Sequence, residues 1–141
     1  MQTLTTPKAV NQVAFSPDGN LLAYGFTEEE KGTITLWDVT TRHEVRTIPY
    51  YGSNSFSFQG NHDLGNRFGF SPDGHTLAAS YCLEETSYSY CSKPVIRFWD
   101  ATTGESLYTL RSCCLVAFSP NGQLLASESG FLWYVGHLMK K

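Results

Sequence analysis

The residues of this chain that could do chemistry do not form a recognisable metal-binding pattern. Four cysteines could in principle bind zinc or form disulfides: Cys82, Cys91, Cys113 and Cys114. No two of them have the Cys-x2-Cys spacing, and no neighbouring histidine completes a zinc-ligand pattern. We therefore expect free thiols, with a Cys82–Cys91 bridge across a hairpin loop as the alternative. The sequence predicts no metal site and no cofactor.

Catalytic motifs are also missing from the sequence. It contains no Gly-x-Ser-x-Gly nucleophile elbow, no phosphate-binding glycine loop and no His-Glu-x-x-His motif. His62 and Asp63 are adjacent, but no nucleophile stands at a readable spacing from them. We therefore expect no catalytic residues and a protein that is not an enzyme.

Composition excludes several further classes of protein. The chain has 141 residues, with 10 Lys+Arg and 13 Asp+Glu, so its formal net charge is −3. This charge argues against binding to nucleic acid or to an acidic membrane surface. The aromatic content of 14% predicts a sizeable core. No apolar run reaches the ~20 residues of a membrane helix, and no signal peptide is visible, so we expect a cytoplasmic protein.

A short motif occurs three times and divides the chain into repeats. Each copy joins an aromatic strand residue to a Ser-Pro-Asp-Gly or Ser-Pro-Asn-Gly turn, which a Leu-Ala run follows. The copies are residues 13–19, 68–74 and 116–122, spaced by about 50 residues. A second motif ending in Trp-Asp occurs twice, at residues 34–38 and 96–100. Short runs of β-branched and aromatic residues between turns predict an all-β fold.

These motifs resemble WD40 repeats, each of which forms a four-stranded antiparallel blade of a β-propeller. The resemblance covers nearly the whole chain and implies about three blades, with strands in the sequence order d, a, b, c. The first repeat spans residues 1–38, with strand d at 1–5, a at 11–15, b at 21–26 and c at 33–37. The remainder comprises the second repeat (43–100, with long loops 49–66 and 83–94), a trimmed third repeat (105–135) and a tail (136–141).

Three blades cannot close a propeller, which needs at least about four. Both faces of a blade are normally buried against neighbours, so three blades alone leave two apolar faces in water. Three interpretations stay open. The chain is part of a longer propeller, or copies of it self-associate through the open blade faces, most simply two chains giving six blades. Alternatively, it is a truncated remnant without independent function.

The resemblance implies structural roles for the repeated aromatic and acidic residues. The phenylalanines before the turns are expected in the core, the tryptophans between blades, and the aspartates as caps of the c–d turn. These residues are Phe15, Phe70 and Phe118, then Trp37 and Trp99, then Asp38 and Asp100. The family's Gly-His pair before strand a is absent from the first and third repeats, so its buried hydrogen-bond network is not expected here.

A partner-binding site is predicted on the long loops of the second repeat. In an up-and-down blade the d–a and b–c loops lie at the same end, so loops 49–66 and 83–94 are expected to be neighbours. Tyrosine among small polar residues is typical of recognition loops on a rigid scaffold. The candidate contact residues are Tyr50, Tyr51, Phe56, Phe58, Tyr88 and Tyr90. In the alternative interpretation these aromatics pack against their own blade.

The function expected from these observations is a protein-interaction or scaffold module with an unidentified protein partner. A fragment of a propeller enzyme is the alternative. The Trp-Asp endings favour the scaffold interpretation, because they are typical of scaffold-type propellers. Clustered His and Asp at inner-strand ends would have favoured the enzyme, and the sequence lacks them.

Overall fold

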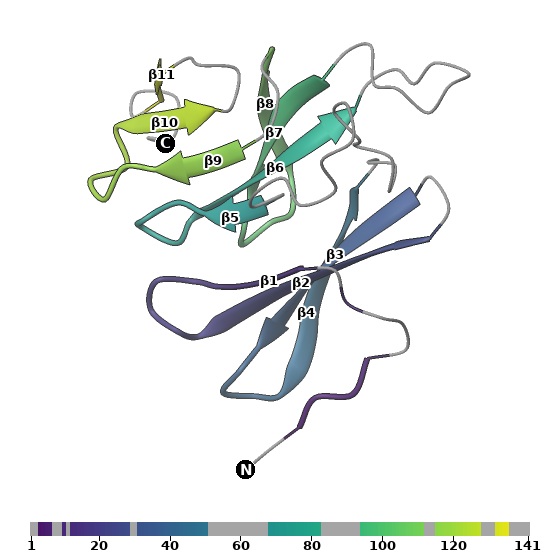
Figure 1. Ribbon diagram of the computed structural model, residues 1–141. Helices are drawn as coiled ribbons and strands as arrows, with labels where there is room; N and C mark the ends of the chain where they lie inside the picture. The colour runs from purple at the N-terminus through teal and green to yellow at the C-terminus, as the bar shows by residue number, and fades with distance from the viewer. Residues whose placement is uncertain are drawn as a thin grey trace.

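The protein consists of antiparallel β-sheets that follow one another along the chain (Figure 1). The computed structural model describes residues 3–6, 10, 12–28, 31–50, 68–82, 94–111, 115–127 and 132–135. In this part of the chain every regular element is a strand. It contains no helix with the length and apolar character that a membrane span requires. The predicted all-β fold is therefore confirmed.

Each sheet is a simple meander in which consecutive strands pair. The first sheet contains β1 (Gln12–Phe15), β2 (Leu21–Glu28), β3 (Lys31–Asp38) and β4 (His43–Tyr50). The second contains β5 (Phe68–Phe70), β6 (Thr76–Cys82), β7 (Pro94–Asp100) and β8 (Ser106–Leu110). The third contains β9 (Leu115–Phe118), β10 (Leu124–Ser127) and β11 (Leu132–Tyr134).

One expected strand differs from the structure. Residues 3–6 lie in no strand, although residues 1–5 were assigned to a strand d. The physical reason is that strand d at this position belongs to the blade before the first sheet. The described residues contain no such blade, so the strand c beside which residues 3–6 would pair is not among them.

The three sheets share one register, which places equivalent residues on equivalent faces. Phe15 pairs with Leu22, and Leu22 pairs with Trp37 across β1, β2 and β3. We call this set of cross-strand neighbours the aromatic row. The aromatic row of the second sheet is Phe70, Leu77 and Trp99. That of the third sheet is Phe118, Leu125 and Trp133. Because side chains alternate between faces, the residues next to each row point to the opposite side.

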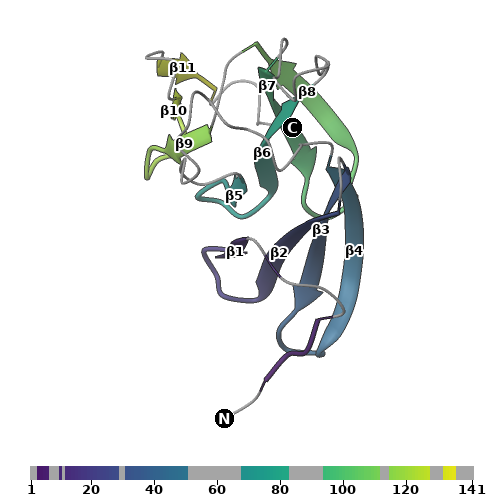
Figure 2. The same ribbon diagram turned by 45° about the vertical axis from the view of Figure 1, so that its right-hand side comes forward.

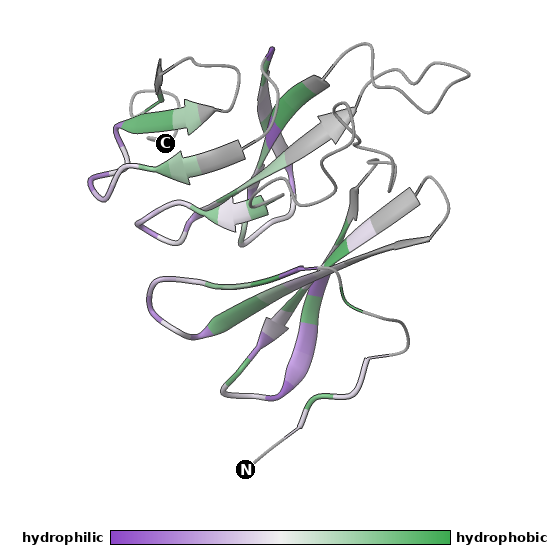
Figure 3. Cartoon of the chain, viewed as in Figure 1, coloured by the Kyte–Doolittle hydropathy of each residue, from purple (hydrophilic) through white to green (hydrophobic). Residues whose placement is uncertain are grey.

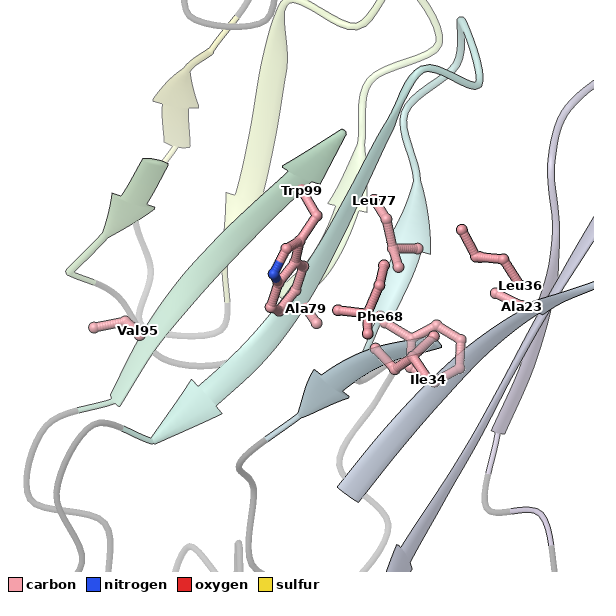
Figure 4. Packing of buried hydrophobic residues seen from close by; sticks show 9 residues of the cluster. Ala23, Ile34, Leu36, Phe68, Leu77, Ala79, Val95 and Trp99 are labelled. Carbon is pink, nitrogen blue, oxygen red and sulfur yellow. The ribbon is translucent and has the colours of Figure 1, made fainter. Parts of the chain in front are cut away.

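The first and second sheets pack face to face through a buried apolar cluster (Figure 4). From the first sheet the cluster takes small and aliphatic residues, including Ala23, Ile34 and Leu36. From the second sheet it takes Leu77 and Trp99 of the aromatic row, together with the residues Phe68, Ala79 and Val95. The aromatic row of the second sheet therefore packs against the aliphatic face of the first.

The second and third sheets repeat this arrangement. Ala78, Ile96 and Phe98 form the opposite face of the second sheet, and they pack with Leu125 of the third-sheet row. Phe118, also of that row, meets Phe98 edge-on, with ring centroids 6.3 Å apart. The second sheet is thus covered on both faces. Figure 2 shows the resulting arc, with β1, β5 and β9 following one another along one side.

Close contacts also tie the first two sheets together. A Cβ at Gly25 would come within 2.8 Å of Phe68 Cε1, so only glycine leaves room for this ring. Gln12 Nε2 donates to the carbonyl of Phe68 at 2.8 Å, and Gln12 Oε1 accepts from the Phe68 N–H at 3.3 Å. One side-chain amide therefore satisfies both backbone groups of a residue in the neighbouring sheet.

Tyr108 lies in the outer strand of the second sheet with a buried phenol. Its ring stacks on Phe98, with centroids 4.5 Å apart. Its hydroxyl oxygen is buried and has no hydrogen-bond partner among the described residues. Burial disfavours the charged phenolate and raises the pKa of Tyr108 from 10.0 to about 12.

Replacing Tyr108 by Phe should leave stability at neutral pH unchanged within about 0.5 kcal/mol or raise it, because the ring stays and an unsatisfied hydroxyl is removed. The folded pKa lies above the unfolded one, so the stability linked to it is complete below pH 10.0 and is lost toward about pH 12. The variant should lack this share of the alkaline loss. Urea unfolding from neutral to alkaline pH measures both effects. A marked loss in the variant at neutral pH would contradict the assignment.

Candidate interaction surface

In the Ser-Pro turns, the polar side chains that the repeats share form hydrogen bonds within the turn itself. Ser71 Oγ donates to Asp73 Oδ1 at 2.5 Å and accepts from the Thr76 N–H at 3.1 Å. Asp73 Oδ1 also accepts from the His75 N–H at 3.0 Å. The same bonds occur in the turn of Ser16, Asp18, Asn20 and Leu21 and in the turn of Ser119, Asn121, Gln123 and Leu124. Because an asparagine oxygen substitutes for the carboxylate in the third turn, the motif needs an acceptor but no charge.

The pKa values of the two turn carboxyls fit this structural role. Partial burial raises the pKa of Asp73, but the bonds from Ser71 and the His75 backbone, with the nearby His75 charge, outweigh it and lower the pKa below 3.8. In Asp18 the hydrogen bond from Ser16 is the main cause of a lowered pKa. Both groups are ionised at neutral pH and already bonded, so neither is suited to general acid–base catalysis.

The aspartates of the Trp-Asp motifs are also used in turns. Asp38 Oδ1 accepts from the backbone N–H groups of Thr40 and Thr41 at 2.8 and 3.0 Å. Asp100 Oδ1 accepts from those of Thr102 and Thr103 at the same two distances. These side-chain bonds hold the tight connections between the third and fourth strands of the first two sheets.

Removing the turn hydroxyl should cost most where the turn is buried. Ser71 and Thr76 are 0% and 2% exposed, so Ser71→Ala leaves a buried N–H unpaired and should lower the free energy of unfolding by about 1–3 kcal/mol. Ser119 makes the same bonds in a more exposed turn, so Ser119→Ala should cost less than about 1 kcal/mol. Urea unfolding of both variants gives the comparison. Equal losses would show that burial does not set the cost.

The predicted partner-binding residues belong to the opposite end of the sheets. Cys82 pairs with Pro94, so the loop between β6 and β7 leaves and returns at adjacent strand ends. Tyr50 ends β4 and pairs with Gly32 at the corresponding end of the first sheet. The strands therefore place the bases of both long loops at one end. Tyr51, Phe56, Phe58, Tyr88 and Tyr90 lie outside the described residues, as does the side chain of Tyr50, so their role stays a prediction.

The prediction of free thiols, its disulfide alternative and the prediction of no metal site also stay predictions. Cys91, Cys113 and Cys114 lie outside the described residues, and Cys82 is described only as the last residue of β6. Among the residues with described positions, no group of three or more His, Cys, Asp or Glu side chains gathers in a way that could hold a metal ion.

A second candidate surface is an exposed apolar face on the first sheet. Val13 and Phe15 are 58% and 63% exposed, and Val39 in the β3–β4 turn is 42% exposed. The prediction that Phe15 lies in the core is therefore wrong. The equivalents of Val13 and Val39 in the second sheet, Phe68 and Ala101, are 3% and 2% exposed, and Phe68 packs against the first sheet. No preceding sheet covers the first one within the described residues.

The remaining repeated aromatics are placed according to which sheets have neighbours. Trp99 is 4% exposed between the first and second sheets. Phe70 and Phe118 are partly buried and pack against the two apolar clusters. Trp37 is half-buried on the exposed face of the first sheet. Hydropathy colouring shows apolar residues on β2 and β3 and polar ones on β4 and the turns (Figure 3).

Sequence reasoning missed Val13 and Val39 as surface residues. The signal was present, because both occupy positions in the first repeat whose equivalents, Phe68 and Ala101, need a preceding sheet for burial. A repeat whose preceding sheet is not among the described residues leaves its leading face uncovered there.

The comparisons with known proteins agree with this architecture. Residues 1–38 match the family model described as WD domain, G-beta repeat. No curated protein matches the sequence. The resemblance to a WD40 repeat is thereby confirmed for residues 1–38, and the described sheets have the fold of β-propeller blades.

Several solved structures resemble the chain at low sequence identity. A eukaryotic initiation factor has 16% identity and a TM-score of 0.55, over 87% of this chain and 27% of that one. A putative 6-phosphogluconolactonase from Bacteroides fragilis has 16% identity and a TM-score of 0.54, over 90% and 38%. The β-propeller domain of the Trilobed protease from Pyrococcus furiosus has 15% identity and a TM-score of 0.51, over 82% and 32%. These likenesses show the fold alone, and the chain spans well under half of each structure.

Proposed function

We propose that the chain is a non-enzymatic protein-interaction module that contributes three blades to a larger propeller. WD40 repeats generally mediate contacts between proteins, and residues 1–38 match that repeat. The chain spans 27% to 38% of the three propeller structures described above, which supports a part rather than a whole propeller. A scaffold role is in keeping with the net charge of −3, which favours neither nucleic acid nor acidic membranes.

The observation that carries this proposal is the use of polar side chains within the described sheets. The shared Ser, Asp and Asn side chains are engaged in turns, and Asp18 and Asp73 have lowered pKa values because of those bonds. Catalytic carboxyls usually have pKa values raised toward the working pH. Two similar structures are a protease domain and a putative lactonase, but that likeness extends to the fold only. A contact surface on the loops is the function that these blades support best.

The proposed contact surface is the loop end of the second sheet. Its loops start from strand ends that the sheet holds in register, as the Cys82–Pro94 pair does for the β6–β7 loop. Tyrosine and phenylalanine in such loops provide large contact area at low entropic cost. We therefore assign partner contact to the six aromatic residues from Tyr50 to Tyr90 named above.

The double variant Tyr51→Ala with Phe56→Ala tests this surface. Immobilised wild-type protein is used to capture partners from cell extract, and bound proteins are identified by mass spectrometry. We expect at least one partner to be retained by the wild type and weakened about tenfold or more by the double variant, because aromatic anchors dominate such contacts. Thr102→Ala, an exposed change at the opposite end of the second sheet, is the matched control and should retain the partner.

Circular dichroism should show that both variants keep the wild-type fold. Equal capture by the double variant and the wild type would remove the loops as the binding surface. Equal loss in the Thr102 control would place the contact elsewhere on the blade.

A further inference from the structure

The leading face of the chain is the side of the first sheet that carries Val13, Phe15, Leu22 and Trp37, together with Val39 in the following turn. Val13, Phe15 and Val39 are exposed and Leu22 and Trp37 are half-buried, whereas Tyr24 and Thr35, which pair on the same side, are buried. The leading face carries the same aromatic row that is covered in the other two sheets. Leu77 and Trp99 are 0% and 4% exposed in the second sheet, and Leu125 is 0% exposed in the third. In the first sheet Phe15 is 63% exposed and Leu22 and Trp37 are half-buried, so the row is less covered there than in the other two sheets. This difference favours the leading face as a sheet-docking face.

The third sheet offers the matching trailing face. Ala117 pairs with Ala126 there, as Ala14 pairs with Ala23 in the first sheet. Ala23 is 0% exposed under the row of the second sheet, whereas Ala117 is exposed and Ala126 half-buried. The small residues that receive an aromatic row are thus present on the third sheet and have no described sheet over them.

The Ser-Pro turns of consecutive sheets also lie next to one another. A Cβ at Gly74 would lie 3.6 Å from Pro17 Cδ, and one at Gly122 would lie 3.6 Å from Pro72 Cδ. Each turn proline therefore sits beside the glycine of the following turn. At the two ends this series is incomplete: Gly19 has nothing within 4 Å of such a Cβ, and Pro120 is exposed.

The strands are complementary as well. The third sheet contains β9, β10 and β11 within the described residues, one strand fewer than the other sheets. Residues 3–6 lie in no strand, yet Thr3-Leu4 resembles Thr47-Ile48 and Thr109-Leu110 of the fourth strands β4 and β8. Strand d of one sheet precedes the next sheet in the sequence, so residues 3–6 belong beside whichever sheet covers the leading face.

We propose that two copies of this chain associate head to tail, with the leading face of each first sheet docked on the trailing face of the other copy's third sheet. Residues 3–6 of each copy then add a strand beside β11 of its partner, and Pro120 of each copy approaches Gly19 of the other. Propellers close with about 4–8 blades. Because the described residues of each copy form three sheets, two copies give a ring within this range, while one or three copies do not. This assembly does not depend on the proposed loop site.

Light scattering on a sizing column over a range of concentrations tests the assembly. We expect the wild type to have twice the chain mass of 15.7 kDa. Phe15→Glu places a charge in the leading face and should weaken association about 100-fold or more. Thr109→Glu is the matched control, because Thr109 is exposed on the outer strand β8 of the second sheet and belongs to neither the leading nor the trailing face. The control should remain dimeric. Deletion of residues 1–6 should weaken association about tenfold or more.

A mixing experiment distinguishes a head-to-tail interface from a symmetric one. Ala117→Glu alters the trailing face only, and alone it should be monomeric at concentrations where the wild type is dimeric. An equimolar mixture of Phe15→Glu and Ala117→Glu contains one intact leading face and one intact trailing face. It should therefore recover a species of two chains, which neither variant forms alone.

Other outcomes would overturn the proposal. A wild type that stays monomeric at all concentrations would mean that the leading face is covered by a blade from elsewhere in a longer protein. A dimer that withstands Phe15→Glu would place its interface on another surface. Circular dichroism of each variant separates loss of association from loss of folding.

Discussion

A β-sheet that is apolar on both faces is stable in water only when both faces are covered, and this constraint shapes the whole molecule. The second sheet meets it: Leu77 and Trp99 pack toward the first sheet, and Ile96 and Phe98 pack toward the third. Each terminal sheet meets it on one side only. The exposed Phe15 and the accessible Ala117 are consequences of this unequal coverage, since their equivalents in the second sheet, Phe70 and Gly69, are half-buried.

Polar side chains also help to hold the sheets where their apolar faces are covered. Ser, Asp and Asn side chains close the turns, and Gln12 bridges the inner strands of two sheets by bonding both backbone groups of Phe68. These bonds fix the register, and the register places the aromatic rows of the second and third sheets opposite an apolar face of the preceding sheet. Side chains committed in this way are poor candidates for catalysis, so recognition falls to the loops and to the uncovered faces.

The repeats made much of the fold predictable from sequence. The Ser-Pro turns and Trp-Asp endings located the strands, because turn chemistry and β-propensity are local properties. Burial of Phe15 could not be inferred in the same way, since it depends on whether a neighbouring sheet exists rather than on the residue. Residues 3–6 lie outside any strand for a related reason: strand d forms only beside the blade to which it belongs, and that blade is not among the described residues. The candidate loop residues from Tyr51 to Tyr90 lie outside the described part of the chain, so the structure gives only the strand ends that hold the two loops.

Amide hydrogen exchange, measured at several protein concentrations, tests most directly the claim that coverage of both faces sets stability. The account predicts that amides of β6 and β7 exchange slowest at every concentration, because the second sheet opens only with global unfolding. It also predicts that protection of β1 and β2 is lower at first and rises with concentration as the leading face becomes covered. Equal protection of the first and second sheets, independent of concentration, would contradict the account.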